Sequence, residues 1–156
     1  MFIKTEDDRK RLVKKVMDLN LEKGPYLVTA EKFKRDRSGA QNRLSHLWYA
    51  ALGKMTGEGK EQIRNYCKWH YGMEILAETD KAFAGFYHHM INTYTYEQCV
   101  KAMQWTQVTS LMSVKQMAEY LNHVDQYAIE RGHQLPQPQD IYYEAMGYDE
   151  QTNASS

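Results

Sequence analysis

The sequence predicts an α+β fold that is mostly helical, in which a small N-terminal β-hairpin or strand pair packs with about five helices. Three observations predict this fold. Apolar residues recur at steps of three and four through much of the chain, two short β-rich stretches lie near the N-terminus, and neither a repeat nor a linker divides the 156 residues. We therefore expect a single domain over residues 1–148 and a disordered tail over residues 149–156.

The N-terminal part contains the predicted strand pair and one helix. Met1–Lys4 is short and apolar enough for an edge strand. Thr5, followed three residues later by Asp8, is a capping pair that starts a helix reaching about Leu21. A Gly-Pro pair then breaks the helix, and Tyr26–Phe33 is β-rich at its start and alternates afterwards. We expect this second stretch to pair with the first four residues.

A further helix is predicted from Gly39 to about Met55, with Ser38 as its N-cap. Its apolar residues share one face, which we expect to be the core side: Ala40, Leu44, Leu47, Trp48, Ala51 and Met55. The opposite side is expected to present Asn42, His46, Tyr49 and Gly53, with Arg43 on a flank. Its place on the apolar face predicts that Trp48 packs in the core rather than stacking on bases.

The middle of the chain is expected to be helical with one extended stretch. Lys60–His70 is predicted to form a short helix. Its expected inward residues are Ile63, Tyr66 and Cys67, and its expected outward residues are Arg64, Lys68 and His70. Lys81–Met103 is also predicted to be helical, because its aromatic and apolar residues crowd together. We expect Trp105–Met112 to be extended.

The clearest helix begins after Ser113, whose pairing with Gln116 is typical of a capping box, and it ends at Gly132. Its apolar stripe consists of Val114, Met117, Leu121, Val124 and Ala128. So strict a stripe favours packing against another helix, within the subunit or across a dimer. Two prolines then end the helix, and Ile141–Met146 is expected to add one helical turn.

Composition excludes several classes of protein. Cys67 and Cys99 are the only cysteines, so neither a disulfide framework nor a four-cysteine zinc site can form. No apolar run approaches the roughly 18 residues of a membrane span, and the charged start MFIKTEDDRKR does not resemble a signal peptide. We therefore expect a soluble protein of the reducing cytoplasm, with no membrane partner and no cofactor.

A metal site is the weaker interpretation of the histidines. Cys67 and His70 have C-x-x-H spacing, and His88 and His89 follow later. Adjacent helical histidines point about 100° apart and rarely bind one ion. No carboxylate or second cysteine stands at ligand spacing to complete the site. We therefore favour surface histidines and a buried thiol, and we predict no bound metal.

The most basic stretch lies between the second predicted strand and the Gly39 helix. This stretch contains only two acidic residues, Glu31 and Asp36, although the net charge of the whole chain is zero. Its five basic residues are Lys32, Lys34, Arg35, Arg37 and Arg43. Guanidinium groups and the first N–H groups of a helix suit phosphate. Any nucleic-acid binding would need such a local patch, because the chain as a whole is neutral.

The order R-x-R-S-x-x-Q-N-R over residues 35–43, followed by an aromatic-bearing helix, resembles the phage NinB family. Ile63–Leu76 is similar to the second helix and connecting loop of that family, and Ser110–Pro138 to its C-terminal helix ending in an E-R-G turn. These blocks cover roughly two-thirds of the chain in the expected order. The resemblance implies a homodimer that binds single-stranded DNA and helps to load a recombinase.

We therefore expect a recombination accessory protein of a phage or prophage that binds DNA, preferring single strands, through the basic turn and the helix after it. The expected binding residues are Arg35, Arg37, Gln41, Asn42, Arg43, His46, Tyr49, Lys54, Lys68 and Trp69. Cations would neutralise phosphates, amides would bond to backbone or base edges, and tyrosine would stack on bases. A recombinase or a host single-strand-binding protein is the expected protein partner.

Two alternatives stay open. The first is a metal-dependent nuclease that uses a set drawn from His70, His88, His89 and nearby carboxylates. The chain lacks H-E-x-x-H, G-x-S-x-G, a phosphate-cradling P-loop and a tight carboxylate cluster, so we expect no enzyme. The second is a helical protein-interaction module in which the basic turn is incidental. Exposed apolar residues on the Val114 helix would favour that interpretation.

Overall fold

The computed structural model describes residues 1, 3–30 and 39–147. Its contacts divide the chain into two compact units, 1–34 and 35–156, where the sequence predicts one domain over residues 1–148. Each unit is described by itself. No helix in the described ranges is long and apolar enough to cross a membrane.

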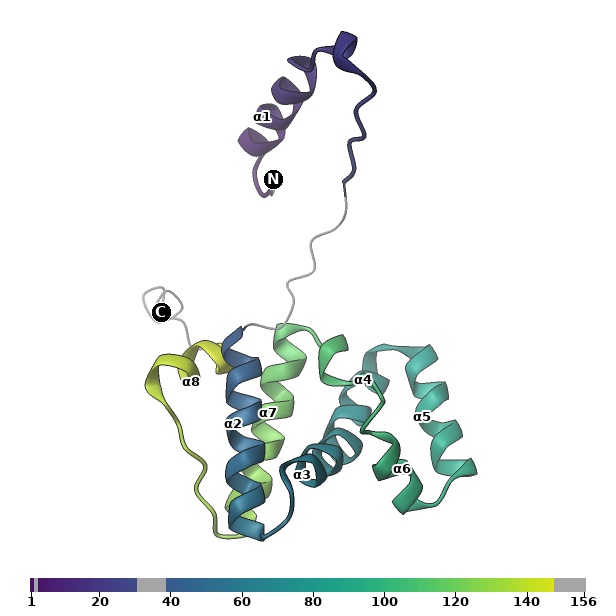
Figure 1. The fold of residues 1–156 in the computed structure, drawn as a ribbon, viewed down its shortest axis with the longest axis vertical. Helices are drawn as coiled ribbons and strands as arrows, with labels where there is room; N and C mark the ends of the chain where they lie inside the picture. The colour runs from purple at the N-terminus through teal and green to yellow at the C-terminus, as the bar shows by residue number, and fades with distance from the viewer. Residues whose placement is uncertain (2, 31–38, 148–156) are drawn as a thin grey trace. The chain divides into compact units, whose positions relative to one another are not determined.

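The described part of the first unit is built on helix α1 (Glu6–Met17) (Figure 1). The predicted capping box is confirmed, because the Asp8 amide donates to the Thr5 hydroxyl and the Asp8 carboxylate accepts from the Thr5 amide. The helix ends at Met17, with Asp18 as its C-cap, earlier than the expected end at Leu21. A short 3-10 turn, η1 (Leu21–Lys23), follows. No residue of α1 is buried within this unit.

The predicted N-terminal β-hairpin is wrong. Among the described residues near the N-terminus, positions 1, 3–4 and 26–30 form no strand, and the end of the expected second strand lies outside the described ranges. The side chains of Tyr26, Leu27 and Val28 are all exposed, so alternation along this stretch places no face against a core. Two strands without a covered face are marginal in water, because sheets draw their stability from burying one side.

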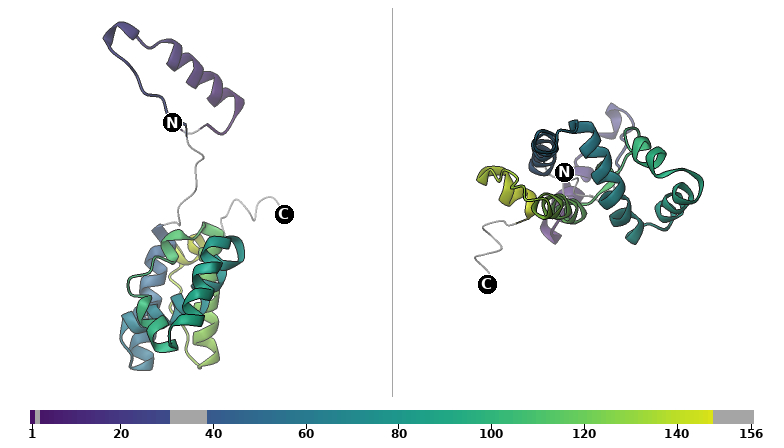
Figure 2. Two further views of the ribbon diagram at one scale, coloured as in Figure 1. Left: turned by 90° about the vertical axis from the view of Figure 1, so that its right-hand side faces the viewer. Right: turned by 90° about the horizontal axis from the view of Figure 1, so that it is seen from below.

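The described part of the second unit is helical, and the views in Figures 1 and 2 show its elements packed side by side. In chain order they are α2 (Gly39–Thr56), α3 (Lys60–Cys67), the π-helical segment η2 (Lys68–Gly72), α4 (Met73–Thr79), α5 (Lys81–Thr93), α6 (Tyr96–Ala102), the 3-10 turn η3 (Thr109–Leu111), α7 (Val114–Glu130) and α8 (Gln139–Met146). Helix α2 packs against α3, α7 and α8, and α5 packs against α4 and α6.

Helix α2 confirms its predicted extent and the burial of Trp48, whose indole is completely buried. The predicted core face is confirmed for Ala40 and Leu44, which are completely buried, but it is wrong at its edges. Leu47 and Met55 are exposed, whereas Tyr49 and Gly53 lie on the buried side. A Cβ on Gly53 would lie only 3.1 Å from the carbonyl oxygen of Glu58, so this glycine allows the loop after α2 to pass close to the helix.

Side-chain caps set the starts of α5, α6 and α7. The Ser113–Gln116 box is confirmed at the start of α7, and the residues of its predicted stripe from Met117 onward are buried. A second box, Thr95 with Gln98, divides the expected Lys81–Met103 helix into α5 and α6. The expected extended stretch after Trp105 is wrong, since it contains the turn η3. The expected helical turn near the C-terminus is confirmed as α8.

The helix that begins at Lys60 does not end at His70. It continues through η2 and α4 to Thr79, so the loop expected there is absent. The π-helical segment turns both Lys68 and Trp69 inward, together with Gly72. A Cβ on Gly72 would lie 2.5 Å from Cγ1 of Val108, so the absence of a side chain lets the segment that precedes η3 pass against the helix.

We predict opposite effects for two helical glycines. Gly72→Ala would force the stiff side chain of Val108 to move and would lower the free energy of unfolding by about 1 to 3 kcal/mol. Gly85→Ala is the matched control, because nothing lies within 4 Å of its Cβ position in α5. Helix propensity alone then predicts stabilisation by about 0.5 to 1 kcal/mol. Urea unfolding of both variants tests this, and equal effects would contradict the close contact at Gly72.

Candidate nucleic-acid interface

The outer side of α2 carries the predicted binding residues that reach the surface. Arg43 and Lys54 are exposed, and Asn42 and His46 are partly exposed. Arg43, Leu47, Ala50 and Lys54 follow one another at steps of three and four, so they form a single strip along the helix. We call these four residues the α2 strip. Arg35 and Arg37, the centre of the predicted basic turn, lie outside the described residues.

Arg43 places its charge near the start of α2. One guanidinium nitrogen lies 3.4 Å from the position that a Cβ on Gly39 would occupy, so the side chain extends back along the first turn. The first turn contains no acidic residue. The partial positive charge of the helix N-terminus and the guanidinium therefore add to each other at this end of the strip.

The other end of the strip borders a groove of about 590 Å³. One wall is α2, which contributes Leu47, Ala50, Ala51, Lys54 and Met55, and the other is the segment 134–137. The indole N–H of Trp48 donates to the carbonyl of Pro136 at 2.7 Å and so fixes that segment beside α2. The groove is apolar along most of its length and has the ammonium of Lys54 at its edge.

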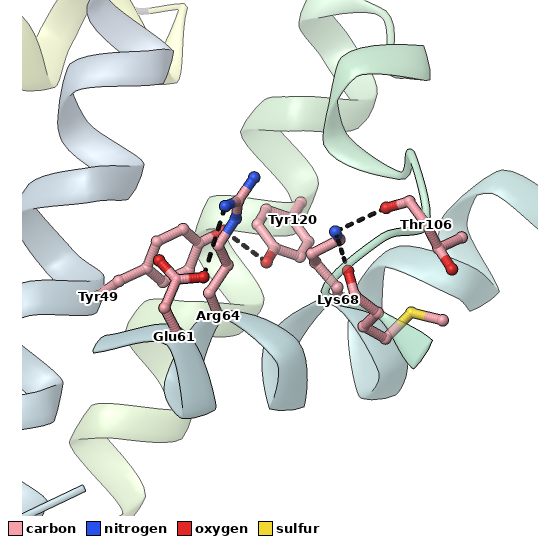
Figure 3. A network of polar contacts seen from close by, with 7 residues as sticks. Tyr49, Glu61, Arg64, Lys68, Thr106 and Tyr120 are labelled. Atoms are coloured by element: carbon pink, nitrogen blue, oxygen red, sulfur yellow. Dashed lines mark hydrogen bonds and ion pairs between the residues drawn. The ribbon is translucent and has the colours of Figure 1, made fainter. Parts of the chain in front are cut away.

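Two residues predicted to contact DNA are instead buried on the inner side of α2. The Gln41 amide donates to the carbonyls of Val114, at 2.8 Å, and Ala145, at 2.9 Å. The Tyr49 hydroxyl shares a hydrogen bond of 2.6 Å with that of Tyr120 (Figure 3). Burial raises the pKa of Tyr120 well above its ordinary value. Neither Gln41 nor Tyr49 presents its polar group at the surface.

Lys68 is also buried, with only 3% of its surface exposed, against the expectation that it faces solvent. Its ammonium donates to the carbonyls of Met103 and Thr106, just beyond the C-terminal end of α6 (Figure 3). Loss of hydration, with a smaller contribution from the nearby Arg64 guanidinium, lowers the pKa of Lys68 to about 8. This lysine satisfies carbonyls at a helix end and holds η2 against α6.

Trp69, the last of the ten predicted residues, is buried as well. Its indole packs edge-on against Tyr87, with ring centroids 5.3 Å apart. It therefore ties η2 to α5 and offers no free ring face for base stacking. Four of the predicted residues therefore belong to the core: Gln41, Tyr49, Lys68 and Trp69. The predicted residues that the described structure brings together at the surface are Arg43 and Lys54 of the α2 strip, with Asn42 and His46 on the same helix.

The side chains considered for a metal site lie in different environments. Burial raises the pKa of the Cys67 thiol to about 12, so it stays protonated. The His70 ring bonds to the Tyr96 hydroxyl at 2.7 Å, and burial lowers the pKa of His70. His88 and His89 are exposed. Among the described residues no group of three or more histidine, cysteine or carboxylate side chains could hold an ion.

Sequence reasoning missed an aromatic cluster that joins α3 and η2 to α7. The rings of Tyr66 and His70 lie 4.0 Å apart, and those of Tyr71 and His123 stack with 9° between their planes. Arg131 lies 3.5 Å over the ring of Tyr127. The step of four between Tyr66 and His70 was the available signal, whereas the other contacts join positions far apart in the chain.

Comparison of the chain with protein-family models, with curated proteins and with solved structures gives no significant match.

We predict that Lys68→Met changes the pH dependence of stability. Because the folded pKa lies near 8 and the ordinary value near 10.5, the folded chain binds fewer protons than the unfolded chain between these pH values. The contribution of Lys68 to the free energy of unfolding therefore rises with pH across that window and is constant below it. The wild type should gain about 1 to 3 kcal/mol relative to the variant between pH 8 and 10.

Urea unfolding at several pH values measures this difference, and the comparison with the variant removes the contributions of other groups, which both proteins contain. Parallel stability curves for the two proteins would contradict a buried, proton-losing Lys68. Equal affinities for single-stranded DNA are expected as well, because Lys68 does not reach the surface.

Proposed function

We propose that this chain is a DNA-binding accessory protein of phage or prophage recombination that prefers single strands and works in the cytoplasm. The observation that carries the proposal is the separation of charge along the chain. The first 43 residues contain twelve Lys or Arg and seven Asp or Glu, whereas the remaining 113 contain eight and thirteen. A neutral protein thus has a basic N-terminal part that runs into the α2 strip, and such asymmetry is typical of nucleic-acid binding.

The spacing of the strip suits a strand laid along the helix. Lys54 follows Arg43 by eleven positions, which at the helical rise corresponds to about 16 Å. Two cations at this separation can neutralise phosphates several nucleotides apart. Arg35 and Arg37 would extend the same contact beyond the start of α2. Asn42 and His46 would add hydrogen bonds to the backbone or to base edges.

The preference for single strands is supported by the apolar groove beside the strip. Unpaired bases can turn out of the backbone and bury part of their surface there, whereas the bases of a duplex stay stacked inside the helix. The groove lacks a described aromatic ring among its lining residues, so contact there would be with aliphatic side chains. Phosphate contacts and apolar packing read little base identity, which predicts weak sequence selectivity.

The role in recombination depends on the resemblance of residues 35–43, 63–76 and 110–138 to the NinB family. Help in loading a recombinase, contact with a host single-strand-binding protein and the homodimer are proposed on the same ground. Gln41, Tyr49, Lys68 and Trp69 have no part in the proposed DNA contact, because their side chains are buried.

A helical protein-interaction module is the second candidate, and one observation favours it. Within its unit α1 exposes Val13, Val16 and Met17 on a helix that also carries several cations. An apolar side on a basic helix is typical of helices that bind in a partner's groove. Failure to bind any oligonucleotide at low salt would favour this candidate over DNA binding.

We predict that Arg43→Ala with Lys54→Ala weakens binding to a labelled single-stranded oligonucleotide about tenfold near 0.1 M salt. The plot of log affinity against log salt should become shallower by about 1.4, since two phosphate contacts are lost. Arg35→Ala with Arg37→Ala should have a similar effect without unfolding the protein. Fluorescence anisotropy over a salt series measures both quantities.

The matched control is Lys81→Ala with Lys101→Ala, which removes two exposed cations from α5 and α6, whereas α2 packs against α3, α7 and α8. This variant should retain wild-type affinity and salt dependence. Equal weakening by both double variants would show that only total charge matters. Running the titration with and without EDTA, and checking that the oligonucleotide stays intact, distinguishes binding from metal-dependent cleavage.

A further inference from the structure

The groove beside the α2 strip has a lining that is more specific than an apolar surface alone. Most of the lining is aliphatic, from Leu47, Ala50, Ala51, Met55, Leu135 and Pro136. The exposed residues Gln134 and Gln137 add two amide side chains. Lys54 is the only charged residue among the described residues that line the groove. One hollow therefore combines an aliphatic surface, hydrogen-bonding amides and a single cation.

Contacts within the protein hold this groove in shape. The buried side chain of Leu135 anchors the segment 134–137 in the core, and the Trp48 indole donates to the carbonyl of Pro136. Figure 1 shows the chain between α7 and α8 running beside α2. Because this wall is already fixed, a ligand that enters does not have to order it, and apolar contact in the groove contributes directly to affinity.

A thymine base matches all three features of the lining. Its 5-methyl group makes the apolar contact by which proteins distinguish thymine from the other bases. Its ring N–H and carbonyl oxygens can bond to a glutamine amide, which carries both a donor and an acceptor. The phosphate of the same nucleotide can reach the ammonium of Lys54. Uracil offers the same hydrogen bonds and the same phosphate, but it lacks the methyl group.

We propose that this groove accepts a thymine base with its 5-methyl group against the aliphatic lining, so that the protein prefers thymine-containing strands to uracil-containing strands. The proposal rests on the proposed binding of single-stranded DNA and names the base that the groove selects. Because RNA carries uracil where DNA carries thymine, the contact also distinguishes DNA from RNA. It does so without the sugar 2′-hydroxyl, which is the usual basis of that distinction.

The size of the preference follows from the one group that differs between the two bases. Burial of one methyl group corresponds to about a fourfold difference in affinity. A factor of this size agrees with the weak sequence selectivity expected from phosphate contacts. The ratio of the two affinities should not change with salt, because a methyl group displaces no counterion, whereas both affinities should fall as salt rises.

Fluorescence anisotropy of the full chain with oligo-dT and oligo-dU of equal length tests the proposal, since these two probes differ only in the methyl group. Oligo-dT should bind about fourfold more tightly than oligo-dU at every salt concentration. Homopolymers of ribothymidine and uridine form a second matched pair, and they should show the same ratio.

A double variant tests whether the groove is the place of this contact. Leu47→Asn with Met55→Gln keeps both side chains near their original size but makes the lining polar. Both positions are partly exposed, so the fold should be retained, and oligo-dT and oligo-dU should then bind equally. Ile91→Asn is the matched control, because it removes an exposed apolar side chain of α5 that does not line the groove. This control should keep the wild-type ratio.

The outcomes separate this proposal from the proposed DNA binding. Equal affinity of the wild type for oligo-dT and oligo-dU would overturn the thymine contact alone, whereas failure to bind either probe at low salt would overturn both. A preference that survives in the double variant would place the methyl contact elsewhere and overturn the proposal. Equal binding of the two DNA probes with weaker binding of both RNA probes would also overturn it, because the sugar would then be the group recognised. Circular dichroism of each variant confirms its helical content.

Discussion

The buried amide of Gln41 determines how the second unit is assembled. Its N–H groups reach the carbonyl of Val114 at the start of α7 and that of Ala145 near the end of α8, so one side chain joins three helices. Leaving such a buried donor without an acceptor would cost about 1 to 3 kcal/mol. This requirement fixes the rotation of α2, and the same rotation directs Trp48 inward and leaves Arg43 and Lys54 outside.

Local chemistry made part of the fold predictable. The capping boxes at Thr5 and Ser113 start helices where the sequence predicts them, because each box involves residues three apart. The apolar stripe of α7 and the burial of Trp48 were also predictable from spacing. The β-hairpin was not, since alternation in the stretch that begins at Tyr26 describes a local preference, whereas a sheet needs a partner strand and a covered face.

Polar residues inside the core explain why the candidate site was harder to predict. Apolar spacing assigned Tyr49 and Lys68 to the surface, but each has a distant partner that satisfies it: Tyr120 and the carbonyls beyond α6. The partners lie tens of residues away, so no local pattern identifies them. The π-helical segment adds to the difficulty, because its wider turn rotates every residue after Cys67 relative to a regular helix.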